Sequence, residues 1–181
     1  GYPVRRGEVL TCVFVVEQPD WTVESWTEPG DPQELAGAFS GWHREVGALV
    51  EAAQSGECFK WALLDRAPLS GWSKGRATLL GDACHPMPPF MAQGAAMAVE
   101  DAAVLAMCLG RTDEPVEEAL GRYEICRRPR TSAMQKRARR NGRVFHMRGV
   151  GAVLRDLVAQ RAAKRTFDRV FRYDALNALP R

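Results

Sequence analysis

The residue types most suited to chemistry occur in one stretch, residues 75–109. Within it, a short apolar run with β character, residues 76–80, ends at Gly81 and Asp82. The carboxyl end of a strand is the usual ligand edge of an α/β fold. A carboxylate at this edge can accept hydrogen bonds from the hydroxyl groups of a ligand. We therefore expect Asp82 to bind a hydroxylated ligand.

A helix that begins with very small side chains follows a proline-rich turn at residues 86–89. It starts close to Gln93 and Gly94 and continues with Ala95 and Ala96. The first backbone N–H groups of a helix have no partner within the helix, and tiny side chains leave them accessible. Such an end favours a negatively charged or carbonyl-bearing group. Together with Asp82, it could hold a polyol and an electron-rich ring oxygen.

The elements around this stretch predict a mixed α+β fold. Two strands that turn at Gly7-Glu8 are expected within residues 2–17, and two helices within residues 31–53. The pattern is helical over residues 115–173, with an interruption or kink at Pro129. A strand-rich first part, a strand–turn–helix centre and a helical tail are typical of the α+β class.

The central stretch resembles a known flavin-binding sequence. Residues 81–102, GDACHPMPPFMAQGAAMAVEDA, are similar to the second flavin motif of the class A flavoprotein aromatic hydroxylases, roughly G-D-A-x-H-x-x-x-P-x-x-x-Q-G-x-x-x-x-x-E-D-A. Within that class the chain looks most like the salicylate hydroxylase and 3-hydroxybenzoate 6-hydroxylase group. The segments YPVRRGE, GWHREV, FKWALLDRAPLSGWSKGR and RYEICRRPRT agree with this. The resemblance therefore spans most of the chain.

The resemblance implies a role for each motif residue. Gly81 and Asp82 would hold FAD, with Asp82 hydrogen-bonded to the ribityl chain. Pro89 would line the flavin ring close to the substrate, and Gln93 would lie near both the ring and the substrate, so these two are the expected catalytic residues. The N–H groups of residues 94–96 would face the pyrimidine edge, where the helix dipole stabilises the charge of reduced flavin. His85 would have a structural or orienting role.

The implied reaction is hydroxylation of an aromatic acid, with FAD as cofactor and NAD(P)H and O2 as co-substrates. The implied fold is a C-terminal fragment of the α/β flavoprotein hydroxylase fold, with a mixed β-sheet of the substrate domain and a helical C-terminal part. We expect residues 1–72 to finish the substrate-binding domain and residues 73–110 to belong to the flavin domain. Residues 111–181 would form C-terminal helices that could also make a homodimer contact.

Other motifs of the class are missing from this chain. It contains no G-x-G-x-x-G, which would hold the FAD pyrophosphate on a βαβ turn, and no Asp-Gly motif. We therefore expect the chain to be the C-terminal part of a longer parent. The missing N-terminal half would bind the ADP part of FAD, and the chain alone would be inactive.

The composition argues against several other classes of protein. The five cysteines are scattered and form no C-x-x-C pair, which disfavours a zinc ribbon or disulfide framework and favours a reducing cytoplasm. The D-x-C-H spacing that begins at Asp82 matches no common zinc pattern, so no metal site is predicted. No apolar run approaches the roughly 20 residues that cross a bilayer, so no membrane partner is predicted.

A second hypothesis rests on a basic block. Ten Lys or Arg, and no acidic residue, occur from Arg127 to Arg155. Arg-rich helices at residues 127–143 could make the chain a stand-alone binding module for nucleic acid or an acidic partner. The absence of aromatic side chains between Tyr123 and Phe145 weakens this hypothesis, because single-strand binders use them for stacking. Without the resemblance, the neighbouring Glu100 and Asp101 would be salt-bridge partners on a solvated helix face.

Overall fold

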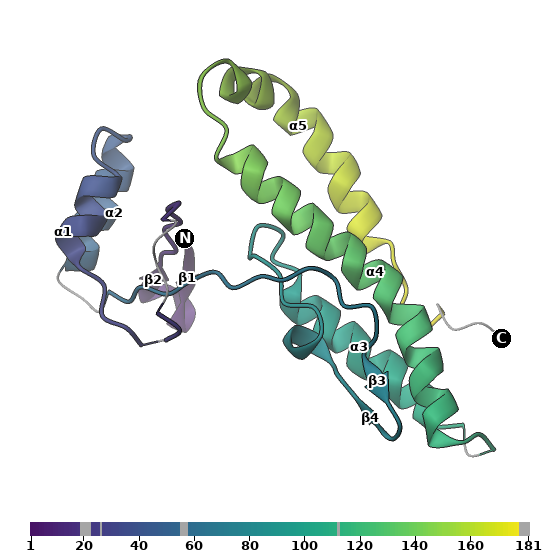
Figure 1. Ribbon diagram of the computed structural model, residues 1–181. Coiled ribbons are helices and arrows are strands. Elements are labelled where there is room, and N and C mark those ends of the chain that lie inside the picture. Colours follow the sequence, from purple (N-terminus) through teal and green to yellow (C-terminus); the bar gives the residue numbers. More distant parts are fainter. Residues whose placement is uncertain (19–22, 26, 55–57, 112, 178–181) are drawn as a thin grey trace. The chain divides into compact units, whose positions relative to one another are not determined.

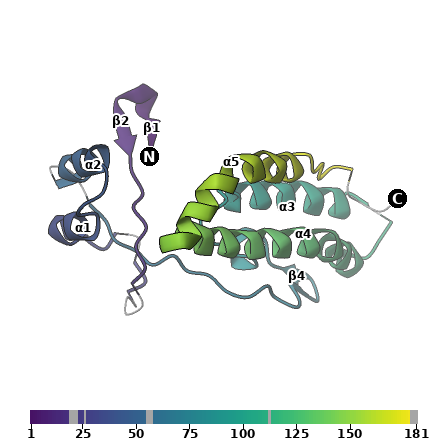
Figure 2. The same ribbon diagram turned by 90° about the horizontal axis from the view of Figure 1, so that it is seen from above.

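The chain forms two compact units, residues 1–62 and 63–181, and each is described by itself (Figures 1 and 2). The computed structural model describes residues 1–18, 23–25, 27–54, 58–111 and 113–177. All of the motif residues lie in the second unit. Residues 63–72, which we assigned to the substrate-binding domain, also pack with this unit, and the functional roles of the units stay a prediction.

A β-hairpin opens the first unit. Strands β1 (Tyr2–Val4) and β2 (Val9–Thr11) pair antiparallel, with Val4 opposite Val9. The connection contains Gly7 at φ +93°, a conformation that favours glycine because a side chain would be strained there. The turn lies where the sequence predicted it.

Two helices complete the regular elements of the first unit, α1 (Pro32–Ala38) and α2 (Arg44–Gln54). The side chain of Asp31 caps α1, since its Oδ1 accepts a hydrogen bond from the backbone N–H of Gln33 at 2.8 Å. Proline follows at the first helical position, where its missing N–H costs nothing. Both helices fall in the range predicted for them.

The second unit is mostly helical. A two-residue hairpin, with Gly75 in its turn at φ +56°, leads into a short 3-10 turn and three helices. The elements in chain order are β3 (Ser73–Lys74), β4 (Ala77–Thr78), η2 (Gly81–Ala83), α3 (Gly94–Leu109), α4 (Val116–Phe145) and α5 (Gly149–Phe171).

Helices α3 and α4 form the core of the second unit, and α5 runs back beside α4 (Figures 1 and 2). Helices α3 and α4 each bury one face, because their inward residues recur every three or four positions. The buried residues of α3 are Met97, Asp101, Val104 and Cys108. Those of α4 are Ala119, Leu120, Tyr123, Arg127, Thr131, Met134, Gln135, Ala138 and Gly142.

The α+β expectation is confirmed, although the strands are small. The described strands pair only as β1–β2 and β3–β4, apart from an isolated bridge between Pro29 and Phe59. The apolar residues 12–16 pair with no other strand in the described part of the chain. They therefore do not form a β-strand, which needs a hydrogen-bonded neighbour. Where the sequence predicted part of a mixed sheet, the described residues form two antiparallel hairpins.

Pro129 does not interrupt α4, which continues from Val116 to Phe145. Ion pairs on either side of the proline attach the helix to α3, from Arg127 to Asp101 and from Arg130 to Glu100. Within the described residues, no helix is long and apolar enough to span a membrane.

Candidate functional site

The strand before α3 ends in a tight corner at Gly81. This residue has φ +61°, and a Cβ atom added to it would lie 3.2 Å from Cβ of Ala98. The carbonyl of Gly81 accepts hydrogen bonds from the backbone N–H groups of Cys84 and His85, both at 3.0 Å. Only glycine satisfies this backbone angle and this approach to α3 without strain. The turn buries Gly81 and leaves Asp82 exposed at the corner.

The carboxylate of Asp82 lies beside the N-terminus of α3. A Cβ atom added to Gly94 would come within 3.8 Å of Oδ1 of Asp82. No side chain caps this helix, and its first turn contains no acidic residue. The N–H groups of Gly94, Ala95 and Ala96 accordingly have no hydrogen-bond partner among the described residues. The site combines an exposed carboxylate with a row of backbone donors at the positive end of a helix.

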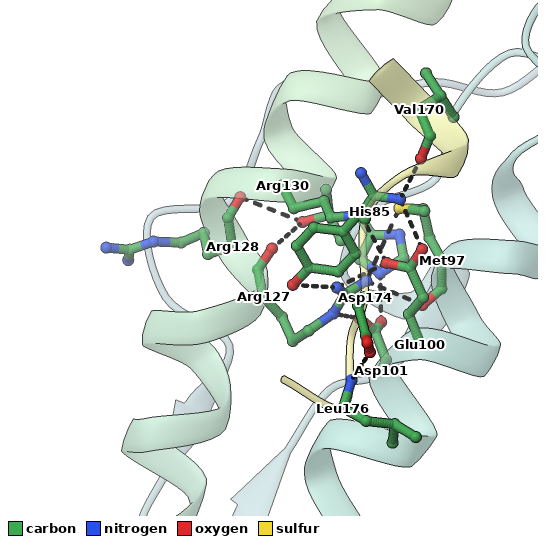
Figure 3. Close-up of polar contacts among 12 residues, drawn as sticks. His85, Met97, Glu100, Asp101, Arg127, Arg128, Arg130, Val170, Asp174 and Leu176 are labelled. Carbon is green, nitrogen blue, oxygen red and sulfur yellow. Dashed lines mark hydrogen bonds and ion pairs between the residues drawn. The ribbon is translucent and has the colours of Figure 1, made fainter. Parts of the chain in front are cut away.

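A buried carboxylate, Asp101 on α3, holds the corner from inside. Its Oδ2 accepts hydrogen bonds from the Gly81 N–H at 3.2 Å and from His85 Nε2 at 2.6 Å. Its Oδ1 accepts from Arg127 Nε at 2.7 Å (Figure 3). Burial alone would raise the pKa of Asp101, but the hydrogen bonds from His85 and Arg127 outweigh it and hold the pKa below its ordinary value. Asp101 is therefore ionised, and His85 donates its Nε2 proton to it.

Arg127 supplies the matching positive charge and is completely buried. It also contacts Glu100 Oε2 at 2.8 Å and the hydroxyl of Tyr173 at 3.2 Å. Burial opposes the charge on Arg127, but Asp101 more than offsets it, so the pKa of the guanidinium is raised. The guanidinium of Arg130 stacks 3.8 Å from the centroid of the Tyr173 ring. The network thus joins α3, α4 and the segment after α5 (Figure 3).

Pro89 and Gln93 come together at the turn before α3. The N–H of Ala92 donates to the carbonyl of Pro89 at 3.0 Å, and Gln93 follows directly. Gln93 is 7% exposed, and its side-chain amide makes no hydrogen bond to any residue that the structure describes, so it is available to a ligand. Pro89 is exposed. No hydrogen bond joins the Pro89 turn to Gly81 or Asp82 in the described part of the chain.

Three buried groups, Cys84, His85 and Asp101, have potential metal-ligand atoms within 4.8 Å of one another. Both oxygens of Asp101 already accept hydrogen bonds, one of them from a positively charged arginine. Burial, assisted by the charge of Asp101, raises the pKa of Cys84 to about 12, so the sulfur is a neutral thiol rather than a thiolate ligand. The donor set suits a buried ion-pair network better than a metal ion.

Much of the basic block is engaged in ion pairs within the second unit. Arginines 127, 128, 130 and 139 pair with Asp101, Glu124, Glu100 and Asp65, respectively. Their charges are neutralised locally, which reduces the positive surface that residues 127–143 can offer to nucleic acid.

Asp101 and Arg127 are the site residues that the sequence-based argument missed. Asp101 is a salt-bridge partner, as the alternative hypothesis expected, but it is completely buried, so the solvated helix face is wrong. A signal was present: Met97, Asp101, Val104 and Cys108 share one helix face, and three of these four residues are apolar. A carboxylate on such a face needs a buried cation, and Arg127 occupies the equivalent face of α4.

Comparison with known proteins assigns the family. Residues 3–138 match the family described as FAD binding domain. The chain belongs to the FAD binding domain family. This agrees with FAD as the cofactor expected from the sequence.

Relatives within the family are similar over most of this chain. It is 44% identical over 147 residues to 3-amino-4-hydroxybenzoate 2-monooxygenase PtnB3 of Streptomyces platensis, which covers 81% of this chain and 37% of that protein. It is 50% identical over 133 residues to 6-hydroxynicotinate 3-monooxygenase of Pseudomonas fluorescens, which covers 72% of this chain and 34% of that protein. The chain thus spans about a third of the length of these relatives.

A solved structure of salicylate hydroxylase in complex with substrate has the same fold, with a TM-score of 0.69 and 27% identity. The match covers 98% of this chain and 45% of the salicylate hydroxylase chain. The resemblance to the class A aromatic hydroxylases, and to the salicylate hydroxylase group within them, is therefore confirmed.

Proposed function

We propose that this chain is the C-terminal part of an FAD-dependent monooxygenase that hydroxylates an aromatic acid with NAD(P)H and O2. The observation that carries the proposal is the exposed carboxylate of Asp82 beside the uncapped N-terminus of α3. Family membership supports the cofactor. The names of the two relatives, monooxygenases of 3-amino-4-hydroxybenzoate and 6-hydroxynicotinate, support an aromatic acid as the class of substrate.

The corner residues fit the isoalloxazine and ribityl parts of FAD. Asp82 would accept hydrogen bonds from the ribityl hydroxyls, since its carboxylate is exposed and makes no hydrogen bond within the described chain. The N–H groups of residues 94–96 would donate to the oxygen and nitrogen atoms of the pyrimidine edge. A Cβ atom at Gly94 would only reach ordinary van der Waals contact with Asp82, whereas one at Gly81 would be strained by φ +61° and would press on Ala98 of α3 at 3.2 Å. The backbone angle and the close approach to α3 explain why the motif has glycine at position 81.

The substrate side of the site would be formed by Pro89 and Gln93. When bound, FAD supplies the redox chemistry, because it accepts electrons from NAD(P)H and passes them to O2. The Gln93 amide can both donate and accept, so it can orient a hydroxyl or carboxylate on the aromatic ring. Pro89 presents an apolar surface without an N–H group and would help to keep water from the reacting atoms.

The rest of the FAD site would come from the longer parent. The chain spans about a third of its relatives and contains no G-x-G-x-x-G for the pyrophosphate. We expect the isolated chain to bind FAD weakly and to be inactive, and the experiments below therefore use the full-length protein.

Replacing Asp82 by alanine in the full-length protein tests the cofactor site. Charge-assisted hydrogen bonds contribute about 1.5–3 kcal/mol, so the Kd for FAD should rise about 10-fold to 150-fold. The measurement is a fluorescence titration of the apoprotein with FAD, together with the flavin-to-protein ratio after purification. Asp156→Ala, which removes an exposed carboxylate on α5, is the matched control and should bind FAD normally. Unchanged FAD affinity in Asp82→Ala would rule out the proposed site.

A further inference from the structure

The proline-rich loop between the Gly81 corner and α3 is attached to α4 at two points. The side chain of Gln135 donates from Nε2 to the carbonyl of Pro86 at 2.9 Å. The side chain of Asn141 donates from Nδ2 to the carbonyl of Phe90 at 3.2 Å, and it also contacts Sδ of Met91 at 2.8 Å. The two anchored carbonyls bracket the part of the loop that contains Pro89.

The two anchors limit the paths that the loop between them can take. Gln135 and Asn141 are six residues apart, which corresponds to about 9 Å along the axis of an α-helix. The four-residue step from Pro86 to Phe90 can span at most about 13–14 Å. Pro88 and Pro89 also have fixed φ angles, so the chain between the anchors has few alternative paths.

A third contact fixes the far end of the loop. The ring of Phe90 lies against the backbone of Gly142, where an added Cβ atom would come within 2.7 Å of Cε2 and 2.9 Å of Cδ2. The same ring makes edge contacts with Phe145 and His146, with centroid distances of 5.9 and 5.8 Å. Glycine at position 142 therefore provides the space that the ring occupies.

The backbone after Phe90 is held in an uncommon conformation. Ala92 has φ +49°, although it is not glycine, and its N–H closes a turn onto the carbonyl of Pro89. Residues keep such angles when the surrounding contacts determine them. The turn passes the position of the loop on to Gln93, which follows Ala92 directly.

We propose that Gln135, Asn141 and Gly142 form a loop clamp that positions Pro89 and Gln93 over the flavin ring and the aromatic substrate. The inference rests on the proposed function, which makes these two residues the substrate side of the site. The clamp residues act through the loop and are positioning residues. The clamp sets how much of the NAD(P)H oxidation ends in hydroxylation, whereas the separate Gly81–Asp82 corner sets FAD affinity.

The test compares Gly142→Ala with Gly121→Ala in the full-length holoenzyme. Both residues lie in α4, but a Cβ atom at Gly121 meets nothing within 4 Å, whereas one at Gly142 collides with Phe90. Hydrogen exchange at the amide of Ala92, which donates to the carbonyl of Pro89, should become about fivefold faster in Gly142→Ala, because displacing Phe90 weakens the turn by about the strength of one hydrogen bond. Gly121→Ala should match the parent.

Two further measurements test whether the position of the loop affects substrate binding and hydroxylation. In Gly142→Ala the change in the flavin absorbance spectrum on binding an aromatic acid should shrink, and the yield of hydroxylated product per NAD(P)H should fall while H2O2 rises. The flavin-to-protein ratio should stay that of the parent. Asn141→Ala, which deletes a hydrogen bond without adding volume, should show the same pattern and decides the question if Gly142→Ala does not fold.

Three results would overturn the clamp: loop exchange equal to the parent in Asn141→Ala, parent-like coupling in both clamp variants, or equal loss of FAD and coupling, which indicates general destabilisation. Failure of the proposed function looks different. In that case the parent itself binds no FAD, while hydrogen exchange still reports whether the clamp holds the loop.

Discussion

Replacing Arg127 by methionine tests the buried network most directly. Methionine keeps much of the side-chain volume and its apolar stem but removes the guanidinium. The change leaves Asp101 completely buried and keeps its hydrogen bonds from Gly81 and His85. It also removes the contacts of Arg127 with Glu100 and Tyr173.

The expected cost follows from the burial of both partners. Breaking a buried ion pair by removing one charge costs about 3–5 kcal/mol, because the remaining charge has lost its compensation. Arg128→Met, one residue further along α4, is the control. Its side chain is 41% exposed and pairs with Glu124 at i,i+4, so the expected cost is below about 1 kcal/mol. The two variants remove the same group from the same helix and differ mainly in burial.

The assay is urea unfolding of the full-length protein followed by far-UV circular dichroism, with FAD affinity measured in parallel. Because Asp101 also accepts the Gly81 N–H, Arg127→Met should weaken FAD binding as well as lower the free energy of unfolding. The double variant Arg127→Met, Asp101→Asn should recover part of the stability, since it removes the unpaired charge. A cost below about 1 kcal/mol for Arg127→Met, or a double variant no more stable than the single one, would refute the reasoning.

The pH dependence of the free energy of unfolding tests the same ion pair independently. The pKa of Asp101 is depressed in the folded protein, so its stabilising contribution is present above the unfolded pKa of about 3.9 and is lost as pH falls through the lower folded value. In Arg127→Met the pKa of Asp101 should rise from this depressed value, because His85 then opposes the effect of burial without Arg127, and protonation relieves the unpaired charge. The difference in unfolding free energy between parent and variant should therefore be largest near pH 7 and shrink as the pH falls towards about 4. A difference that stays constant over this range would mean that Asp101 is not the group responsible.

Two further substitutions examine the corner and the substrate side. Gly81→Ala should lower stability by more than the roughly 1–2 kcal/mol expected for alanine at positive φ and should reduce bound flavin, because its Cβ also meets Ala98 at 3.2 Å. Gly75→Ala has a similar φ of +56° and no atom within 4 Å of the added Cβ, so equal costs in urea unfolding would exclude a steric contribution at the corner. Gln93→Ala should keep its flavin but form less hydroxylated product per NAD(P)H, measured by product chromatography against NAD(P)H consumption; unchanged coupling and turnover would count against the role of Gln93.

The sequence predicted those features that depend on residues close together in the chain. The hairpin turn at Gly7, the Asp31 cap of α1 and the start of α3 at Gly94 were all correct. Each depends on a backbone angle or on a hydrogen bond within a few residues, so local residue types suffice. The motif at residues 81–102 likewise identified the family, because its glycines, carboxylates and amide occur at characteristic spacings.

Only the tertiary structure decided which distant residues meet. Asp101 and Arg127 are 26 residues apart, and Asn141 and Phe90 are 51 apart. Helical periodicity places a residue on a buried face, but the partner it meets depends on how α3 packs on α4 and in which register. The strands show the same limit, since the apolar residues 12–16 form no ladder without a neighbouring strand. Side-chain pairing and sheet formation require surfaces from separate parts of the chain, and a one-dimensional pattern does not contain their relative placement.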